Sequence, residues 1–585
     1  SDVLQRLNPS TPVLATTATA NARVTEDVAQ QLGHGPGGFE ESGASSSEEG
    51  ATLVLRGALA RASLELSVVD RLTPLERYAW VVDHLPKLAG SGIVYTLTVA
   101  DAERLTEAVR AVHGDAVLVA AYTGQLEASA REGLEDALRR NELKALIATS
   151  ALGMGYDKPD LGFVIHVGSP PSPVSYYQQV GRAGRAISHA HAVLLPSDAD
   201  SGVWDYFATA TIPVPEQVRR VLDVLGASGP SGPDGPAASA GSAEPMSVAA
   251  VEAQSGVRRG RVELMLKQLA VDSVVERVEG GWVATGKEWS YDAEHYDGVV
   301  AVRRREADIM RAYTRGEHCL MQLLQESLDD PTAEPCGRCS VCVGSLPADL
   351  SARPSDATVD AVTGVLRGQV HLLEPRKMWP GGAFGSRGRI AADEMPEIGR
   401  TLVFADAPEW RETIAAMFAR DAAAPDDVLQ ACVRMLSSWR SSWAARPEVV
   451  VDLPAAGFPL LTGSVADHLA SVGKLARASF AAAAAGGDGT ASSDGGGAVS
   501  GEGRGPGGRS RLEELREMNS AEEAAFWRDR LHGGAADSVT ESVAGRSVLL
   551  VVDATSSIWP ITVASAVLRR AGASVVLPLL LHRRP

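Results

Sequence analysis

Residues 145–195 have the sequence ALIATSALGMGYDKPDLGFVIHVGSPPSPVSYYQQVGRAGRAISHAHAVLL, and this stretch decides the fold. It contains three short apolar runs rich in β-branched residues, separated by turns and by one helical segment. Three similar runs precede it, so the expected strands are Leu64–Val69, Gly92–Leu97, Ala116–Tyr122, Ala145–Thr149, Phe163–Val167 and His191–Leu195. Because strands alternate with helices, the pattern predicts one parallel sheet covered on both faces, in a multidomain α/β protein.

The end of this stretch carries its most distinctive chemistry. Gly181 and Gly184 allow a close approach of backbone, and Arg182 and Arg185 are three residues apart, which predicts two guanidinium groups on one face of a helical turn. A short glycine–arginine segment also occurs by chance in surface loops, so it identifies no function by itself.

Three segments together resemble helicase motifs III, V and VI of the RecQ family in superfamily two: PVLATTATAN at 12–21, ATSALGMGYD at 148–157 and YYQQVGRAGR at 176–185. The resemblance implies a RecA-like helicase domain in which Arg185 reaches the γ-phosphate of ATP as an arginine finger. It also implies that Arg182 contacts phosphate or a neighbouring domain, and that Gln178 belongs to the same catalytic group. Thr123 stands where the family usually has histidine, which puts one local contact in doubt.

The same resemblance implies softer roles for other residues of these segments. Thr149 and Ser150 could reach a DNA phosphate, and Asp157 could contact the ribose or Arg182. The residues expected to couple nucleotide state to domain movement are Thr17, Thr19, Asn21, Gly153, Gly155, Asp157, Gly181 and Gly184.

Two parts of a nucleotide motor are missing from the sequence. It contains no G-x-x-x-x-G-K-[ST] loop for phosphates, and its one Asp-Glu pair, Asp393-Glu394, is followed by Met-Pro and not by the family's x-His. We therefore expect the chain to begin inside the first motor domain, by truncation or through a gene-model artefact, and to hydrolyse no ATP alone.

The resemblance implies that the complete parent is a DNA helicase of 3′ to 5′ polarity that uses ATP and Mg²⁺ and acts in repair and recombination. Its expected partners are single-stranded DNA and duplex junctions. The alternatives are a non-catalytic DNA-binding or annealing module, a nucleotide-related transferase, and an RNA helicase.

Four of the five cysteines are spaced like metal ligands, as Cys319-x16-Cys336-x2-Cys339-x2-Cys342. Four thiolates at this spacing predict a closed, structural Zn²⁺ site, with the first ligand on a helix and the others in one tight loop. Binding would supply about 10 to 16 kcal/mol of apparent folding free energy. A redox pair or four unconnected buried thiols are the alternatives, and Cys432 is expected in a core. The order also matches the RecQ zinc signature.

Residues 246–285 predict a winged helix: helices at Val248–Gln254 and Arg258–Ala270, then a hairpin over Val274–Thr285. Arginines at the start of the second helix, and a later triplet, predict phosphate contacts with DNA. Nearby Glu263 and Glu306 leave open a solvated charged face instead. The arginines concerned are Arg258, Arg259 and Arg261, and Arg303, Arg304 and Arg305.

The strand, loop and helix from Ser547 resemble a phosphoribosyltransferase-type fold, which binds ribose through an acidic pair and a 5′-phosphate through the next loop. Only Asp553 of the pair is present, because Val552 occupies the other position. We expect a degenerate site, kept as a structural or regulatory remnant, in which Thr555, Ser556 and Ser557 could still bind phosphate.

The composition fits a large cytoplasmic, nucleoid-associated protein. The net charge of −18 excludes a uniformly basic coat, although part of the acidity lies in a Gly/Ser-rich insertion, and no apolar run reaches the length of a membrane helix. The expected divisions are 1–33 (end of the first motor domain), 34–52 (disordered insertion), 53–225 (second RecA-like domain), 226–245 (linker), 246–300 (winged helix), 301–344 (zinc module) and 360–585 (transferase-like domain with a low-complexity insertion at 481–510).

Overall fold

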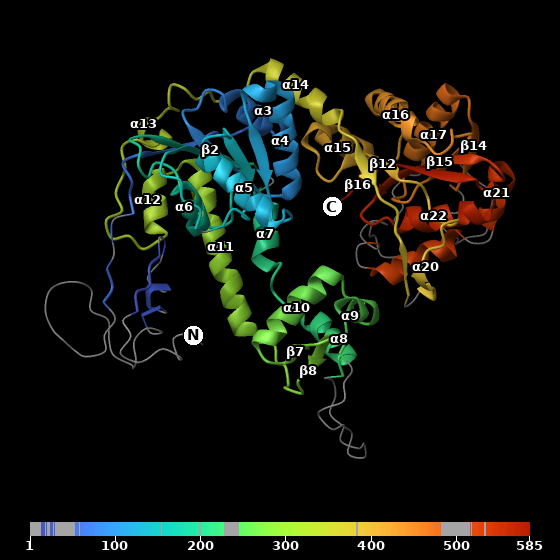
Figure 1. Cartoon of the computed structure of the whole chain (residues 1–585), viewed down its shortest axis with the longest axis horizontal. Helices are drawn as coiled ribbons and strands as arrows, with labels where there is room; N and C mark the ends of the chain where they lie inside the picture. Colours follow the sequence, from blue (N-terminus) through green and yellow to red (C-terminus); the bar gives the residue numbers. More distant parts are fainter. Residues whose placement is uncertain are drawn as a thin grey trace, which may run out of the picture. The chain divides into compact units, whose positions relative to one another are not determined.

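The structure is a computed structural model of the whole chain (Figure 1), and it describes residues 13–17, 19, 24–26, 28–29, 53–55, 57, 59–153, 155–197, 200–226, 245–381, 384–480, 515, 518–531 and 534–584. The expected insertion at 34–52, most of the linker at 226–245 and the segment 481–510 lie outside these residues. The chain divides into two compact units, 1–212 with 292–367, and 213–291 with 368–585. No described helix is long and apolar enough to cross a membrane.

The first unit is built on one six-stranded parallel sheet with the order β1-β6-β5-β2-β4-β3. All six predicted strands are confirmed, with ends that differ by at most a few residues. Their bounds are β1 Leu64–Val68, β2 Ser91–Thr96, β3 Val119–Tyr122, β4 Ala145–Ala148, β5 Leu161–Val167 and β6 Ala190–Leu195.

Helices cover both faces of this sheet, as the pattern predicts (Figure 1). One core lies against the helices α3 and α4, and the other lies against α5 and α6. Helix α3 starts at Pro74 because Thr73 and Glu76 form a reciprocal capping box. The helices are α3 Pro74–His84, α4 Val99–His113, α5 Ala128–Arg139, α6 Pro173–Val180 and α7 Asp200–Thr209.

Four later helices complete the first unit: α11 Ala293–Arg315, α12 Leu320–Glu326, α13 Ser340–Val343 and α14 Asp356–Arg367. The cysteine-bearing region shares the core of α6, where the hydroxyl groups of Tyr313 and Tyr176 are 3.2 Å apart. Helix α14 packs on α3 and α4 through Val362 and Leu366. The predicted domain start at residue 360 is therefore wrong, because α14 buries its apolar face against α3 and α4 of the first unit.

The second unit begins with α8 Pro215–Val224, which shares a small core with α9 Val248–Ser255 and α10 Arg259–Val271. The hairpin β7 Val275–Val278 and β8 Gly281–Ala284 follows, so the predicted helices and strands of this segment are confirmed. We expected residues up to 225 in the RecA-like domain. Helix α8 instead buries Val218, Val221 and Leu222 in this core, so that boundary is wrong.

The rest of the second unit contains a six-stranded sheet with the order β14-β13-β15-β16-β12-β9, in which only β9 is antiparallel. Apolar clusters cover both of its faces. The elements are β9 His371–Leu373, β10 Met378–Pro380, β11 Arg387–Arg389, β12 Gly399–Phe404, α15 Arg411–Ala419, α16 Asp426–Trp439, β13 Val449–Leu453, α17 Pro459–Gly473, β14 Ala476–Ser479, α20 Ser520–Leu531, α21 Gly534–Val543, β15 Ser547–Thr555, α22 Trp559–Arg570 and β16 Val575–Arg583.

Candidate functional site

The connection from β4 to β5 forms the centre of the candidate site in the first unit. Its first residue, Thr149, donates its amide to the Tyr122 carbonyl of β3 at 3.2 Å, and a turn follows in which the Leu152 amide donates to the Thr149 carbonyl at 3.2 Å. Thr149 is buried and Ser150 is exposed, so only Ser150 of this predicted DNA-contacting pair presents its side chain to solvent. Gly155 has a φ of +106°, a conformation that side chains disfavour, so glycine is required there.

Arg182 holds the connection between β4 and β5 from inside the domain, through hydrogen bonds to its backbone. The residue is 6% exposed, and its guanidinium donates to the carbonyls of Gly153 and Tyr156 at 2.7 and 2.9 Å. A charged donor that satisfies two buried carbonyls fixes the path of the loop. The geometry therefore supports a positioning role for Arg182, and the predicted phosphate contact stays a prediction.

Arg185 lies on the outside of the same turn. Helix α6 ends at Val180 with Gly181 as its cap, so the predicted helical turn that would align both arginines is wrong. The Arg185 side chain is 38% exposed, and its guanidinium contacts the Asp157 carboxylate at 2.7 Å. Asp157 thus pairs with Arg185 and does not contact Arg182, which was one of its two predicted partners. The other predicted partner, a ribose, stays a prediction. Arg182 therefore holds Gly153 and Tyr156 from inside the domain, and Arg185 contacts Asp157 at the surface.

The glycine-rich turn has two further fixed points. Gly184 has a φ of +68°, and a Cβ there would lie 2.8 Å from the Ser63 hydroxyl oxygen. Ser63 donates to the Gly184 carbonyl at 2.6 Å, so the turn is pinned to the start of β1. Gln178 donates to the Thr19 hydroxyl, and the Thr19 amide donates to the Thr17 hydroxyl at 3.2 Å. The structure thus brings motif III and motif VI residues together, while Asn21 lies outside the described residues.

His166 is a buried residue that the sequence analysis missed. Its Nε2 lies 2.7 Å from the Gln179 side-chain oxygen, and its ring packs against Tyr95 and Tyr176. Burial lowers the pKa of His166 to about 4, so the imidazole is neutral at pH 7. The uncharged ring holds α6 on the sheet through its contacts with Gln179 and Tyr176. The sequence shows only a histidine within an otherwise apolar strand, which does not reveal its partners.

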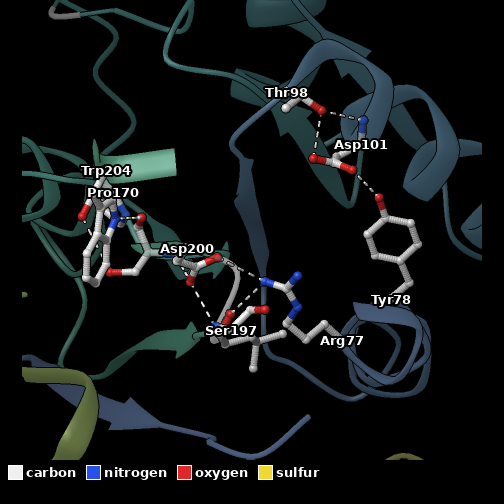
Figure 2. Close-up of polar contacts among 10 residues, drawn as sticks. Arg77, Tyr78, Thr98, Asp101, Pro170, Ser197, Asp200 and Trp204 are labelled. Carbon is white, nitrogen blue, oxygen red and sulfur yellow. Dashed lines mark hydrogen bonds and ion pairs between the residues drawn. The ribbon is translucent and has the colours of Figure 1, made fainter. Parts of the chain in front are cut away.

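A second missed network fixes the loop that precedes α6 (Figure 2). The Asp200 carboxylate accepts from the amides of Ser197 and Ser169 at 2.8 and 2.9 Å, and Arg77 lies 3.7 Å away. Burial raises the pKa of Asp200. Trp204 donates to the Ser169 carbonyl at 2.7 Å. These contacts hold the loop ends of β5 and β6 and thereby orient the helix that carries Gln178.

The four predicted metal ligands come together in the first unit. All four cysteine Sγ atoms lie within 4.8 Å of one another, and those of Cys319 and Cys339 are 4.0 Å apart. A tetrahedral Zn²⁺ site with Zn–S bonds of about 2.3 Å needs sulfurs roughly 3.8 Å apart, so the geometry fits zinc. Cys319 and Cys339 precede α12 and α13, and Cys342 lies within α13. We predicted the first ligand on a helix and the other three in one loop. That division is wrong, because Cys319 precedes its helix and Cys342 lies within one.

The predicted DNA-contacting arginines have different surroundings. Arg258 and Arg259 are exposed at the start of α10, and Arg261 is half-buried there. Arg259 pairs with Glu263 at 3.0 Å across one helical turn, which matches the alternative of a charged face. In α11, Arg303 donates to the Ala208 carbonyl and the Thr211 hydroxyl at 3.0 and 2.7 Å. Arg303 therefore anchors α11, while Arg304 and Arg305 are exposed.

Asp553 in the second unit faces inward. It is fully buried and accepts from the amides of Ala456 and Phe458 at 2.9 and 3.1 Å, which holds the loop after β13. Burial raises its pKa to about 6. Ser557 donates to Glu523 at 2.6 Å, Thr555 donates to the Ser557 carbonyl at 2.6 Å, and Ser556 is half-buried. Asp553 is thus committed to loop structure and presents no carboxylate to a ribose.

Comparison with known proteins gives the class of the first unit. Residues 76–187 match the family described as helicase conserved C-terminal domain. Together with the parallel sheet, this match gives the first unit a RecA-like fold similar to that of helicase C-terminal domains. A crystal structure of a DEAD box protein from Methanococcus jannaschii is 28% identical over 26% of this chain and 40% of that one, with a TM-score of 0.22.

The same region relates the chain to RecQ-type helicases. It is 32% identical over 192 residues to the ATP-dependent DNA helicase RecQ of Pasteurella multocida, which covers 33% of this chain and 27% of that protein. It is 34% identical over 202 residues to the ATP-dependent DNA helicase Q-like 4B of Arabidopsis thaliana, which covers 34% and 16% of the two chains. The resemblance to the RecQ type is therefore confirmed, over about a quarter of the Pasteurella relative's length.

Proposed function

We propose that this chain provides the second motor domain and the DNA-binding parts of a RecQ-type, ATP-dependent 3′ to 5′ DNA helicase that acts in repair and recombination. One observation carries the proposal: Arg185 is presented at the surface by a glycine-punctuated turn that Arg182 fixes from inside. A rigid turn that presents one exposed guanidinium would allow Arg185 to contact the phosphate of a nucleotide bound by another domain. Asp157 then holds Arg185 in place until phosphate competes for it.

The cysteine cluster and the basic start of α10 support the DNA-binding part of this proposal. A structural Zn²⁺ on the four cysteines would order the segment that joins α11 to α14. Arg258, Arg259 and Arg261 at the start of α10 would contact duplex phosphates as in a winged helix. Single-stranded DNA and duplex junctions in the nucleoid are the proposed ligands.

ATP hydrolysis provides the first test. We expect no DNA-stimulated hydrolysis from this chain alone, because its sequence has no phosphate loop. A fusion to the nucleotide-binding domain of a RecQ-type helicase should hydrolyse ATP, and Arg185→Ala should lower that rate by about 10³ to 10⁵. The exposed pair Arg140–Glu142 offers a matched control, because Arg140→Ala should leave the rate unchanged. If the isolated chain hydrolysed ATP and Arg185→Ala abolished that hydrolysis, the prediction that the chain alone is inactive would be refuted.

DNA binding tests the role of α10. Affinity of the full chain for a forked oligonucleotide, measured by fluorescence anisotropy, should fall steeply as salt rises. The double variant R258A/R259A should reduce the slope of log affinity against log salt by about 2 if both residues contact phosphates. The variant R411A/R440A removes two exposed arginines elsewhere in the second unit and should leave the slope unchanged. Equal slopes for all three proteins would place α10 outside the DNA interface.

A further inference from the structure

A cluster of two histidines and a glutamate lies in the first unit, away from the cysteines and the arginine turn. Glu65 in β1 and His191 in β6 are direct partners in the parallel register, and His189 precedes His191 by two residues. A ligand atom from each of the three side chains lies within 4.8 Å of the others. Two imidazoles and a carboxylate are a common ligand set for transition metals.

His191 has the feature that points to a ligand. Its side chain is only 7% exposed, and its Nε2 lies 2.9 Å from the Asp349 carboxylate. That contact places the ring proton on Nε2 and leaves a lone pair on Nδ1. Nδ1 is buried without a hydrogen-bond partner among the described residues, and it lies 3.8 Å from the Glu65 carboxylate oxygen. A buried acceptor without a partner is costly unless something else binds it.

His189 completes the arrangement from the solvent side. Its Nε2 is 2.6 Å from the same Glu65 oxygen, and its ring packs edge-on to that of His191 at 4.6 Å. Tetrahedral ligands with metal bonds of about 2.0 to 2.1 Å lie roughly 3.4 Å apart, between the two histidine–glutamate separations. A metal ion could therefore replace the proton shared by His189 and Glu65 with side-chain shifts of about 1 Å.

We propose that Glu65, His189 and His191 bind one divalent transition-metal ion of the zinc type, with Asp349 orienting His191. Imidazole nitrogens favour Zn²⁺, Co²⁺ or Ni²⁺ over Mg²⁺. Three protein ligands leave one position for water, and His189 gives the site access to solvent. Asp349 belongs to the segment between α13 and α14, so its bond to His191 links that segment to the strand that carries the proposed ligands. The site is independent of the proposed helicase function.

Cobalt titration tests the site. The full chain, with its cysteines loaded with Zn²⁺, would be titrated with Co²⁺ and followed by visible absorption and calorimetry. We expect about one further equivalent of Co²⁺ with weak visible bands and without the intense thiolate charge-transfer absorption that exchange at the cysteines would give. Wild-type protein that binds no Co²⁺ outside the cysteines would overturn the proposal.

Variants assign the ligands. Glu65→Gln and His189→Ala should each abolish the extra equivalent, and His189 is exposed enough for its loss to leave the fold intact. Asp349→Asn should weaken binding by about 10- to 100-fold, as is usual for a group that orients a metal-binding histidine. His295→Ala removes an exposed histidine from α11 and serves as the control, with no change expected. Unchanged Co²⁺ affinity in both Glu65→Gln and His189→Ala would also overturn the proposal.

Discussion

Arg182 and Arg185 are three residues apart, yet only Arg182 is buried. Arg182→Ala would leave the carbonyls of Gly153 and Tyr156 without their charged donor. We expect the free energy of unfolding of the first unit to fall by roughly 3 kcal/mol, measured by urea denaturation. Arg185→Ala removes an exposed ion pair and one hydrogen bond to the Gly181 carbonyl, so it should cost about 1 kcal/mol or less. Similar losses in the two variants would show that Arg182 does not brace the loop.

At the scale of single residues, the sequence predicts residue types better than contacts. It predicted functional roles for Arg182, Arg185 and Asp157, but it offered Asp157 a ribose or Arg182 as partner and missed Arg185. Pairing depends on which way each side chain leaves the turn, and that direction is set by the end of α6 at Val180. His166 escaped notice because its importance comes from the burial of its ring between two tyrosines, which no local pattern reveals.

At the scale of elements, the sheet of the first unit was predictable almost strand by strand. Its strands are buried on both faces, so they appear in the sequence as short continuous apolar runs between turn residues. The α9–α10 pair and the β7–β8 hairpin were also predictable from local signals, because glycine turns at Gly256 and at Gly280-Gly281 separate their elements.

The partners of helices were not predictable. The pattern of an amphipathic helix predicts that one face is buried, but it does not predict which element that face packs against. Helix α8 follows the RecA-like domain in sequence and packs with α9 and α10, and α14 follows the cysteines and packs on α3. The predicted boundaries at 225 and 360 failed at these two helices.

At the scale of the whole molecule, the two units have separate apolar cores. The cysteines share one core with the sheet of the first unit, while the second sheet has its own clusters on both faces. Cooperative unfolding follows a shared core, so the sheet of the first unit and the sheet of the second should unfold in separate calorimetric transitions. A metal bound by the cysteines should stabilise only the unit whose core contains them.

Removing zinc tests that division. Treatment with a strong chelator should lower the melting temperature of one transition by roughly 10 °C or more and leave the other within a degree or so, because metal binding couples only to the core it helps to close. Added Zn²⁺ should restore the first transition. Cys339→Ser, which removes a buried ligand, should reproduce the shift without chelator, whereas Ser438→Ala in α16 should leave that transition unchanged. If both transitions moved together, the cysteine cluster would have to support the whole chain and not the helicase unit alone.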